Sequence, residues 1–408
     1  MRRILATIAA LTLGLAATGA GADCTGRDMI AELPEAERAA LRASTAAVPF
    51  AEGNLWQARR GGQVVHIAGT YHFDDPRHDD TLARLTPALD EAKTLLVEAG
   101  PEEEAALKSR LAREPELMVA VDGPTLPETL PPEVWEQLSE ALSQRGVPAF
   151  MAAKLRPWYL SMVLSIPTCQ MAEAAGGSRG LDGMLMDAAT ERGLPLKALE
   201  PYDTVFRIFE MMPQQDQLSM ITSALAMEEQ SADMASTLAE AYFAGHSRLI
   251  WEFMRTETLK LPGYTPERVE REFATMETAM MTSRNRAWIP VIEAAAAEGP
   301  VLAAFGALHL SGEDGVLNLL AQNGWTVTPL PAGPRPWRGI SGSSASDGLS
   351  MKDRWPWVAH GRLHRISGQP RRIIRRALLF RRDQPPASGA AAAGRKGSGL
   401  FVHHKTLL

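Results

Sequence analysis

The chain has 408 residues, a net charge of −6 and a hydrophobic content of 45%. This acidic balance gives no general affinity for nucleic acid, so we expect no nucleic-acid partner. Only two cysteines are present, which excludes a thiol-rich metal site. The length is sufficient for one large domain or two small ones.

The first residues of the chain have the three regions of a secretory signal peptide. Met1-Arg2-Arg3 is basic, an apolar run follows, and Ala20-Gly21-Ala22 supplies small residues for cleavage. The apolar part is too short to favour a membrane span, and a retained anchor is the alternative. We therefore expect residues 1–22 to be removed and the mature protein to be periplasmic or secreted, without a transmembrane segment.

Cys24 and Cys169 are the two cysteines. In an exported protein an even number of cysteines favours a disulfide, and two unpaired thiols are the alternative. In the chain-entropy model a loop of this length contributes on the order of 4 kcal/mol to stability. We expect the disulfide to join the new N-terminus to the middle of the domain.

The end of the chain, residues 332–408, differs from the rest. It holds 15 Lys and Arg against 3 Asp and Glu and is rich in Pro, Gly, Ser and Ala. This composition predicts a basic, low-complexity, disordered tail. A basic amphipathic stretch at residues 371–382 is compatible with weak membrane contact, and an incidental extension is the alternative.

Two distant stretches share a short apolar run followed by Gly-x-x-His. The first runs from Val64 to His72 and the second from Val301 to His309. A short apolar run bounded by turn residues indicates a strand buried on both faces of a sheet. The spacing alone is a weak signal, because residues 361–364 repeat it without a strand. The preceding strands make His72 and His309 candidates.

Two further predicted strands end in a carboxylate. Residues 93–99 contain Glu98, and residues 194–200 contain Glu200. A carboxylate at the end of an apolar strand is costly to bury alone, so it needs a metal ion, an arginine or several donors. The alternatives are a structural ion pair for Glu98 and a helix start or packing role for Glu200.

These features predict one α/β domain over residues 23–331, with a central, mostly parallel sheet flanked by helices. A helical insertion separates the two Gly-x-x-His halves, and an edge strand after Trp56, a hairpin at Gly61-Gly62 and a last strand near residues 325–330 complete the sheet. The predicted helices cover residues 28–46, 79–92, 101–113, 131–145, 152–166, 181–192, 216–245, 266–297 and 311–323. Methionines recur at helical spacing in residues 216–245, which is more typical of core or groove lining than of a cofactor site.

Ligands of parallel α/β sheets bind at the carboxyl ends of the strands, where His72, Glu98, Glu200 and His309 are predicted to lie. Imidazoles and carboxylates are ligands of Zn²⁺, Mn²⁺ and similar ions, and three ligands plus a water would give a metal-activated hydroxide. Without a metal, a His and Glu pair supports acid–base work on a bound water. The alternative is that each residue is a satisfied strand end.

The two Gly-x-x-His motifs resemble the TraB/GumN family, which includes the Tiki metalloproteases. The matching pieces are Gly69-Thr70-Tyr71-His72, Leu96-Val97-Glu98, Gly180-Leu181-Asp182, Leu199-Glu200, Arg284-Asn285, Gly306-Ala307-Leu308-His309 and Leu310-Ser311-Gly312. The resemblance covers about residues 23–330 and leaves out the tail. It implies a fold related to the erythromycin-esterase and ChaN-like proteins.

The resemblance also implies a site made of the two histidines, Glu98 and an arginine, with a divalent ion such as Mn²⁺, Co²⁺ or Zn²⁺. We expect His72 and His309 to bind the metal and Glu98 to be a ligand or a general base. Glu200 is a weaker addition to the ligand set.

Arg284 is our choice for the catalytic arginine, and Arg286 is the runner-up. A guanidinium holds a substrate carboxylate or stabilises an oxyanion. Tyr71 and Asn285 belong to the same motifs, and we expect them to contact the substrate.

Three hypotheses for function follow. The first is an exported metal-dependent hydrolase, and more narrowly a peptidase, acting on a peptide or another small cell-envelope substrate. The second is a periplasmic protein that binds haem or another ligand without turnover. The third is a cell-envelope or polysaccharide assembly factor with a vestigial site. Retention of both histidines and Glu98 favours a working site over a vestigial one.

Overall fold

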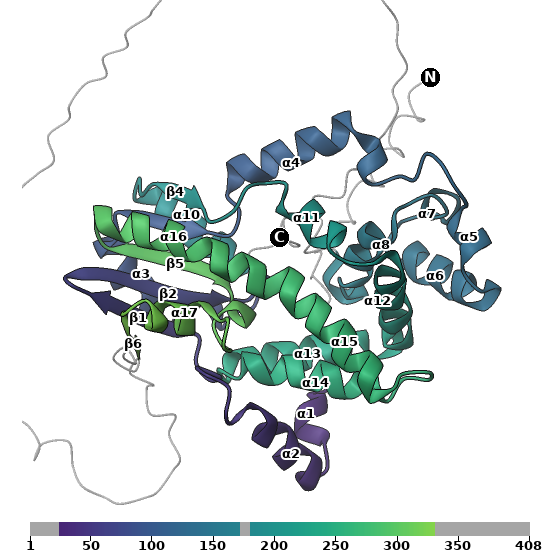
Figure 1. The fold of residues 1–408 in the computed structure, drawn as a ribbon, viewed down its shortest axis with the longest axis horizontal. Helices are drawn as coiled ribbons and strands as arrows, with labels where there is room; N and C mark the ends of the chain where they lie inside the picture. The colour runs from purple at the N-terminus through teal and green to yellow at the C-terminus, as the bar shows by residue number, and fades with distance from the viewer. Residues whose placement is uncertain (1–23, 172–179, 331–408) are drawn as a thin grey trace, which may run out of the picture. The chain divides into compact units, whose positions relative to one another are not determined.

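A computed structural model describes residues 24–171 and 180–330 (Figure 1). The predicted signal peptide, residues 1–22, lies outside the described residues, as does the predicted tail, residues 332–408.

Six strands form one mixed sheet. They are β1 (Leu55–Arg60), β2 (Gln63–Thr70), β3 (Thr94–Val97), β4 (Leu196–Ala198), β5 (Val301–Gly306) and β6 (Thr326–Pro329). The order is β4-β3-β5-β2-β1-β6. The four predicted central strands, β4, β3, β5 and β2, are parallel neighbours, which confirms the mostly parallel sheet. The hairpin strand β1 runs antiparallel to β2, and β6 runs antiparallel to β1. The prediction that the strand after Trp56 is an edge strand is wrong, because β6 pairs with its outer side.

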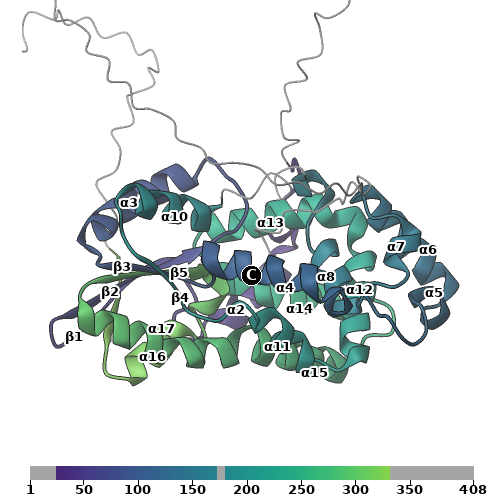
Figure 2. The ribbon, with the colours of Figure 1, turned by 90° about the horizontal axis from the view of Figure 1, so that it is seen from above.

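Helices cover both faces of the sheet because its central strands are apolar on both sides. Figure 2 shows α3 (His78–Glu91) and α10 (Leu181–Glu191) on one face and α16 (Ser283–Glu298) and α17 (Val316–Gln322) on the other. Ile67 of β2 packs in the core with α16 and α17, whereas its neighbour Ala68 packs in the core with α3 and α10. Successive side chains of β2 point to opposite faces of the sheet, so this one strand contributes to both hydrophobic cores.

Most of the chain between β3 and β5 is helical, as predicted (Figures 1 and 2). The other α-helices of the described residues are α1 (Met29–Glu32), α2 (Glu35–Thr45), α4 (Pro101–Arg113), α5 (Leu126–Thr129), α6 (Pro132–Gln144), α7 (Ala149–Ala152), α8 (Pro157–Leu164), α11 (Thr204–Glu210), α12 (Gln214–Ala226), α13 (Ser231–Phe243), α14 (Ser247–Leu259) and α15 (Pro266–Glu277). Helices α8 and α11–α14 all contribute side chains to a cavity that begins at the ends of the parallel strands.

Prolines account for two helices that differ from the prediction. The helix predicted over residues 28–46 divides into α1 and α2, because Pro34 has no N–H and favours extended backbone at Leu33. The helix predicted over residues 152–166 begins only at Pro157, which occupies the first helical position.

The two longest predicted helices are both interrupted. Residues 216–245 form α12 and α13 with a 3-10 turn between them, where Glu228 pairs with the buried guanidinium of Arg145. Residues 266–297 form α15 and α16 with a π-helical turn, Thr278–Thr282, between them. Hydrophobic periodicity continues through such short irregular turns, so the sequence pattern does not reveal them.

The helix predicted over residues 311–323 is shorter than expected. It begins only at Val316, because turns that include Gly312 and Gly315 precede it. Gly312 has a φ of 103°, a conformation that ends regular structure and favours glycine.

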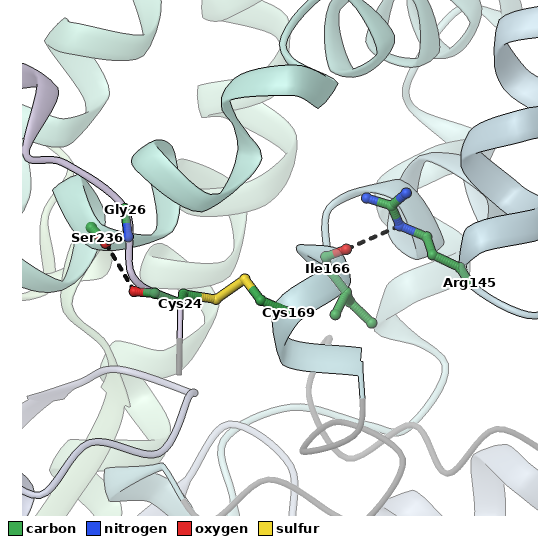
Figure 3. The surroundings of a disulfide bond; sticks show 6 residues. All are labelled: Cys24, Gly26, Arg145, Ile166, Cys169 and Ser236. Carbon is green, nitrogen blue, oxygen red and sulfur yellow. Dashed lines mark hydrogen bonds between the residues drawn. A yellow bond between two sulfur atoms is a disulfide. The ribbon is translucent and has the colours of Figure 1, made fainter. Parts of the chain in front are cut away.

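Cys24 and Cys169 form the predicted disulfide, with their Cα atoms 5.4 Å apart (Figure 3). The segment after Cys24 lies along α13, where the Gly26 N–H donates to Ser236 Oγ at 3.0 Å. The bond therefore joins the first described residue to the middle of the domain. Every helix within residues 24–171 and 180–330 is too short or too polar to cross a membrane.

Candidate active site

The four predicted strand-end residues come together at one edge of the sheet. His72 follows β2, Glu98 follows β3, Glu200 follows β4, and His309 lies in the 3-10 turn Ala307–His309 after β5. Glu98, Glu200 and His309 are buried, whereas 36% of the His72 side chain is exposed. The prediction that these four residues lie together at the carboxyl ends of the strands is therefore correct.

The guanidinium of Arg284, near the start of α16, bonds to three of these four residues. Its Nε and Nη2 donate to the two oxygens of Glu200, both at 2.8 Å. Nη2 also donates to Glu98 Oε2 at 2.6 Å, and Nη1 lies 3.2 Å from His309 Nε2. One buried cation thus compensates two buried carboxylates, each of which is costly to bury alone.

Glu98 is held as a carboxylate. Its Oε1 accepts the Gly306 N–H at 2.6 Å. Burial raises the pKa of Glu98, but the charge of Arg284, helped by His72 and by the Gly306 N–H, outweighs burial and lowers the pKa to about 2. At Glu200 burial dominates, so its pKa lies above the ordinary value although Arg284 opposes the shift.

His309 is a neutral imidazole with a fixed tautomer. Its Nδ1 lies 2.6 Å from Asn285 Oδ1, an atom that only accepts, so Nδ1 carries the proton. Burial and the adjacent charge of Arg284 lower the pKa of His309 to about 3. The Trp288 ring lies 4.5 Å from the imidazole, centroid to centroid, and fixes its plane. The lone pair of Nε2 therefore faces the site.

His72 has the same orientation but a charged partner. Its Nδ1 lies 2.8 Å from Asp182 Oδ2, and Thr70 Oγ1 donates to Asp182 Oδ1 at 2.5 Å. Burial lowers the pKa of His72, but the carboxylates of Asp182 and Glu98 outweigh it and raise the pKa to about 9. Sequence reasoning gave Asp182 no role, and its only signal was the Gly180-Leu181-Asp182 piece of the family resemblance.

The glycines of the two Gly-x-x-His motifs lack space for a side chain. A Cβ on Gly69 would lie 2.5 Å from Leu310 Cδ1 and 3.0 Å from Ala307 Cα, in the turn that carries His309. A Cβ on Gly306 would lie 3.3 Å from Glu98 Oε1 and 3.5 Å from His72 Nε2. Gly69 thus allows the two motifs to pack together, and Gly306 keeps the centre of the site open.

The other predicted site residues occupy three different places. Tyr71 lines the cavity and stacks on Tyr242, with ring centroids 5.4 Å apart. Asn285 is buried behind His309 and holds its ring, so its contacts in the structure are with protein rather than with the cavity. Arg286 is exposed and pairs with Asp314 at 2.8 Å. Arg284 rather than Arg286 is therefore the arginine at the strand ends.

A cavity of about 390 Å³ opens from this cluster. His72, Glu98, Arg284 and His309 line one end of it. Most of the remaining lining is apolar and comes from α8, α11, α12, α13, α14 and the π-helical turn. An apolar cavity with a few convergent polar groups at one end is typical of a binding or active site.

The sequence model of the TraB/PrgY/gumN family matches residues 54–329, which span the sheet from β1 to β6 and include every strand-end residue above. The chain belongs to the TraB/PrgY/gumN family. The family resemblance is therefore confirmed. No curated protein and no solved structure matched the chain, so the likeness to erythromycin-esterase and ChaN-like folds stays a prediction.

The side chains at the strand ends fit the predicted divalent ion in chemistry but not in their present spacing. As the side chains stand, no three His, Cys, Asp or Glu residues of the described chain lie close enough together to hold a metal. The donor chemistry of His72, His309 and Glu98 nevertheless fits a divalent ion. Each histidine Nδ1 is held by a side-chain oxygen, so each Nε2 points into the site, as it does in metal-binding histidines. His309 Nε2 lies 3.9 Å from Glu98 Oε1.

Two features limit that fit. Glu200, unlike Glu98, does not line the cavity, and its oxygens accept hydrogen bonds from Arg284 and from Trp288 Nε1 at 3.0 Å, so we leave Glu200 out of the proposed ligand set. Arg284 also donates to His309 Nε2, and this bond must open before that nitrogen binds an ion. Metal binding therefore stays a prediction, and it involves His72, His309 and Glu98.

Proposed function

We propose that this chain is an exported, metal-dependent hydrolase of the TraB/PrgY/gumN family. One observation carries the proposal: His72 Nε2, Glu98 Oε1 and the His309 ring surround Gly306 at the polar end of an apolar cavity, with His309 Nε2 3.9 Å from Glu98 Oε1. The disulfide supports export, because such bonds persist in oxidising compartments such as the periplasm.

In this proposal His72 Nε2 and His309 Nε2 would hold a divalent ion. The ion would lower the pKa of a bound water and polarise the carbonyl that the water attacks. Glu98 Oε1 accepts a proton from the water and passes it to the leaving group. The hydroxyl of the water joins the acyl carbon as the bond to the leaving group breaks, so the reaction needs no oxidant or reductant.

Arg284 has two roles in the proposed reaction. Its bonds to Glu98 and Glu200 hold the base in place. Its charge lies beside the position where the carbonyl oxygen becomes negative, which favours the transition state over the substrate. The apolar walls of the cavity exclude water and strengthen both interactions.

The test measures hydrolysis by the purified full chain with Mn²⁺, Co²⁺, Zn²⁺ or a chelator, on panels of chromogenic esters and fluorogenic peptides. We expect turnover with one of the ions, lost on chelation and reduced at least a hundredfold in His72→Ala and Glu98→Gln. His246→Ala, at a half-buried histidine that does not line the cavity, is the control. Absence of turnover on both panels, or unchanged turnover in both variants, would overturn the proposal.

A second candidate function is ligand binding without turnover. It is favoured by the bonds of Arg284, which pair Glu98, Glu200 and His309 within the protein itself. A binder would take up haem or another ligand in the same cavity and hydrolyse nothing. Haem addition followed by its absorption band separates this function from the hydrolase.

A further inference from the structure

A second cavity of about 370 Å³ adjoins the first. The two share four lining residues, Tyr71, Ser165, Met220 and Leu238. The second cavity extends away from the strand ends, between α12, α13, α14 and α15, and none of His72, Glu98, Arg284 or His309 lines it.

Methionines make up much of the second lining. They are Met212, Met220, Met227, Met234, Met254 and Met276. Methionine is unbranched and flexible, and such surfaces adapt to flexible apolar ligands. This set includes the methionines of residues 216–245 that the sequence assigned to core or groove lining.

The polar groups of the lining are largely engaged with protein. Glu228 pairs with Arg145, and Glu272 pairs with Arg268. Ser165 Oγ donates to the Met162 carbonyl of its own helix at 2.8 Å. An extended peptide needs partners for its own N–H and C=O groups, and burying them unpaired is costly.

Gln170 is an exception, since its Oε1 is buried and has no hydrogen-bond partner in the part of the chain that the structure describes. A single acceptor does not pair the backbone of a peptide that fills both cavities. An alkyl chain needs no partners at all, so the lining favours it over a peptide.

Among the described residues, Arg284 is the only lysine or arginine that lines either cavity, and it lies at the polar end beside Glu98. A ligand with a carbonyl at one end and a long apolar chain matches this distribution. We propose that the two adjoining cavities bind the unbranched acyl chain of a lipid ester or amide, with its carbonyl at the strand-end site. The placement of the carbonyl rests on the proposed hydrolase activity, and the placement of the acyl chain rests on the two cavities.

The test uses p-nitrophenyl esters from acetate to palmitate with the full chain. We expect kcat/KM to rise roughly fourfold per added methylene until the cavities are full, since each buried methylene gains hydrophobic free energy. Met220→Trp places a bulky ring where the cavities meet, so the ratio of long-chain to short-chain kcat/KM should fall at least tenfold. Met151→Trp, at an exposed methionine outside both cavities, should leave the ratio unchanged.

A binding measurement separates failure of this proposal from failure of the proposed function. The fluorescent C18 fatty acid cis-parinaric acid should bind the wild-type chain and be displaced by palmitate. Probe binding without ester turnover would retain the acyl-chain site and overturn the hydrolase. Turnover with flat chain-length dependence and no probe binding would overturn the acyl-chain site, as would an apolar peptide that binds where the probe does not. If Met220→Trp does not fold, the wild-type series and the probe decide.

Discussion

His72 Nδ1 lies 2.8 Å from Asp182 Oδ2, and this contact determines which ring nitrogen faces the cavity. Because the carboxylate accepts a hydrogen bond from Nδ1, Nε2 is the ring nitrogen that lies beside Glu98. His309 has the equivalent contact with a neutral acceptor, Asn285 Oδ1. The two imidazoles are therefore oriented alike and charged differently.

Asp182→Asn keeps the shape of the side chain and removes its charge. We expect a ten- to hundredfold loss of kcat/KM, typical for partners that orient a metal-binding histidine. The pKa of His72 in ion-free protein should fall, because the Asp182 carboxylate is what raises it most. NMR titration of the His72 ring measures this, with Asp187→Asn at an exposed position of α10 as the control. An unmoved His72 pKa would show that Asp182 does not act through this ring.

Alanine at the two motif glycines should have opposite consequences. Gly306→Ala puts a methyl between Glu98 and His72, and its φ of −49° suits alanine, so the fold should persist while activity falls at least tenfold. Gly69→Ala forces a Cβ against Leu310 and should lower the free energy of unfolding by about 1–3 kcal/mol. Thermal unfolding and kcat/KM of both variants test the pair. Equal effects on stability would contradict the distinction.

The sequence predicted the strand ends because two independent signals coincide there. Apolar runs identified the four parallel strands, and polar residues directly after them identified His72, Glu98, Glu200 and His309. Asp182 escaped prediction because its partner lies about 110 positions away, at a separation that no local pattern reports. Sequence order likewise did not show that Asn285 lies behind His309.

The free energy of unfolding should fall below neutral pH because of His78. This residue is fully buried, its Nε2 donates to the Phe73 carbonyl at 3.0 Å, and Nδ1 has no hydrogen-bond partner among the described residues. Burial lowers its pKa in the folded state, so below about pH 6.5 the unfolded chain binds a proton that the folded chain does not. The contribution of neutral His78 to the free energy of unfolding is therefore fully present above that pH. It is lost as pH falls, at up to about 1.4 kcal/mol per pH unit.

Urea unfolding between pH 7 and pH 5 checks this effect. His78→Phe should flatten the pH dependence relative to wild type, whereas His246→Gln, at a half-buried histidine, should not. Parallel pH profiles for wild type and His78→Phe would refute the assignment to His78.

The disulfide should contribute measurably to stability. Cys169→Ser, or reduction of the wild-type protein, should lower the free energy of unfolding by about 2–4 kcal/mol, because the unfolded chain gains freedom when the Cys24 link is lost. Cys24→Ser is the matched variant and should give the same loss. Identical unfolding curves with and without reductant would contradict the expected contribution.

The cavities were beyond sequence prediction for a different reason. Their walls come from helices that are separate in the chain, including α8, α12 and α14. The break between α12 and α13 redirects the methionines of residues 216–245 toward a shared interior space, and helical periodicity gave no sign of that break. Composition indicated an apolar, adaptable surface, but only packing shows that it continues from the strand-end site.

The most direct test of the central claim is metal content by elemental analysis of the purified chain after loading with Mn²⁺, Co²⁺, Zn²⁺ or Fe²⁺. The claim is that His72 and His309 hold one ion at a shared site. We predict about one ion per chain in wild type and in His246→Ala, and loss of that ion in both His72→Ala and His309→Ala. Absence of any bound ion in wild type, or retention of the ion in both variants, would contradict the claim.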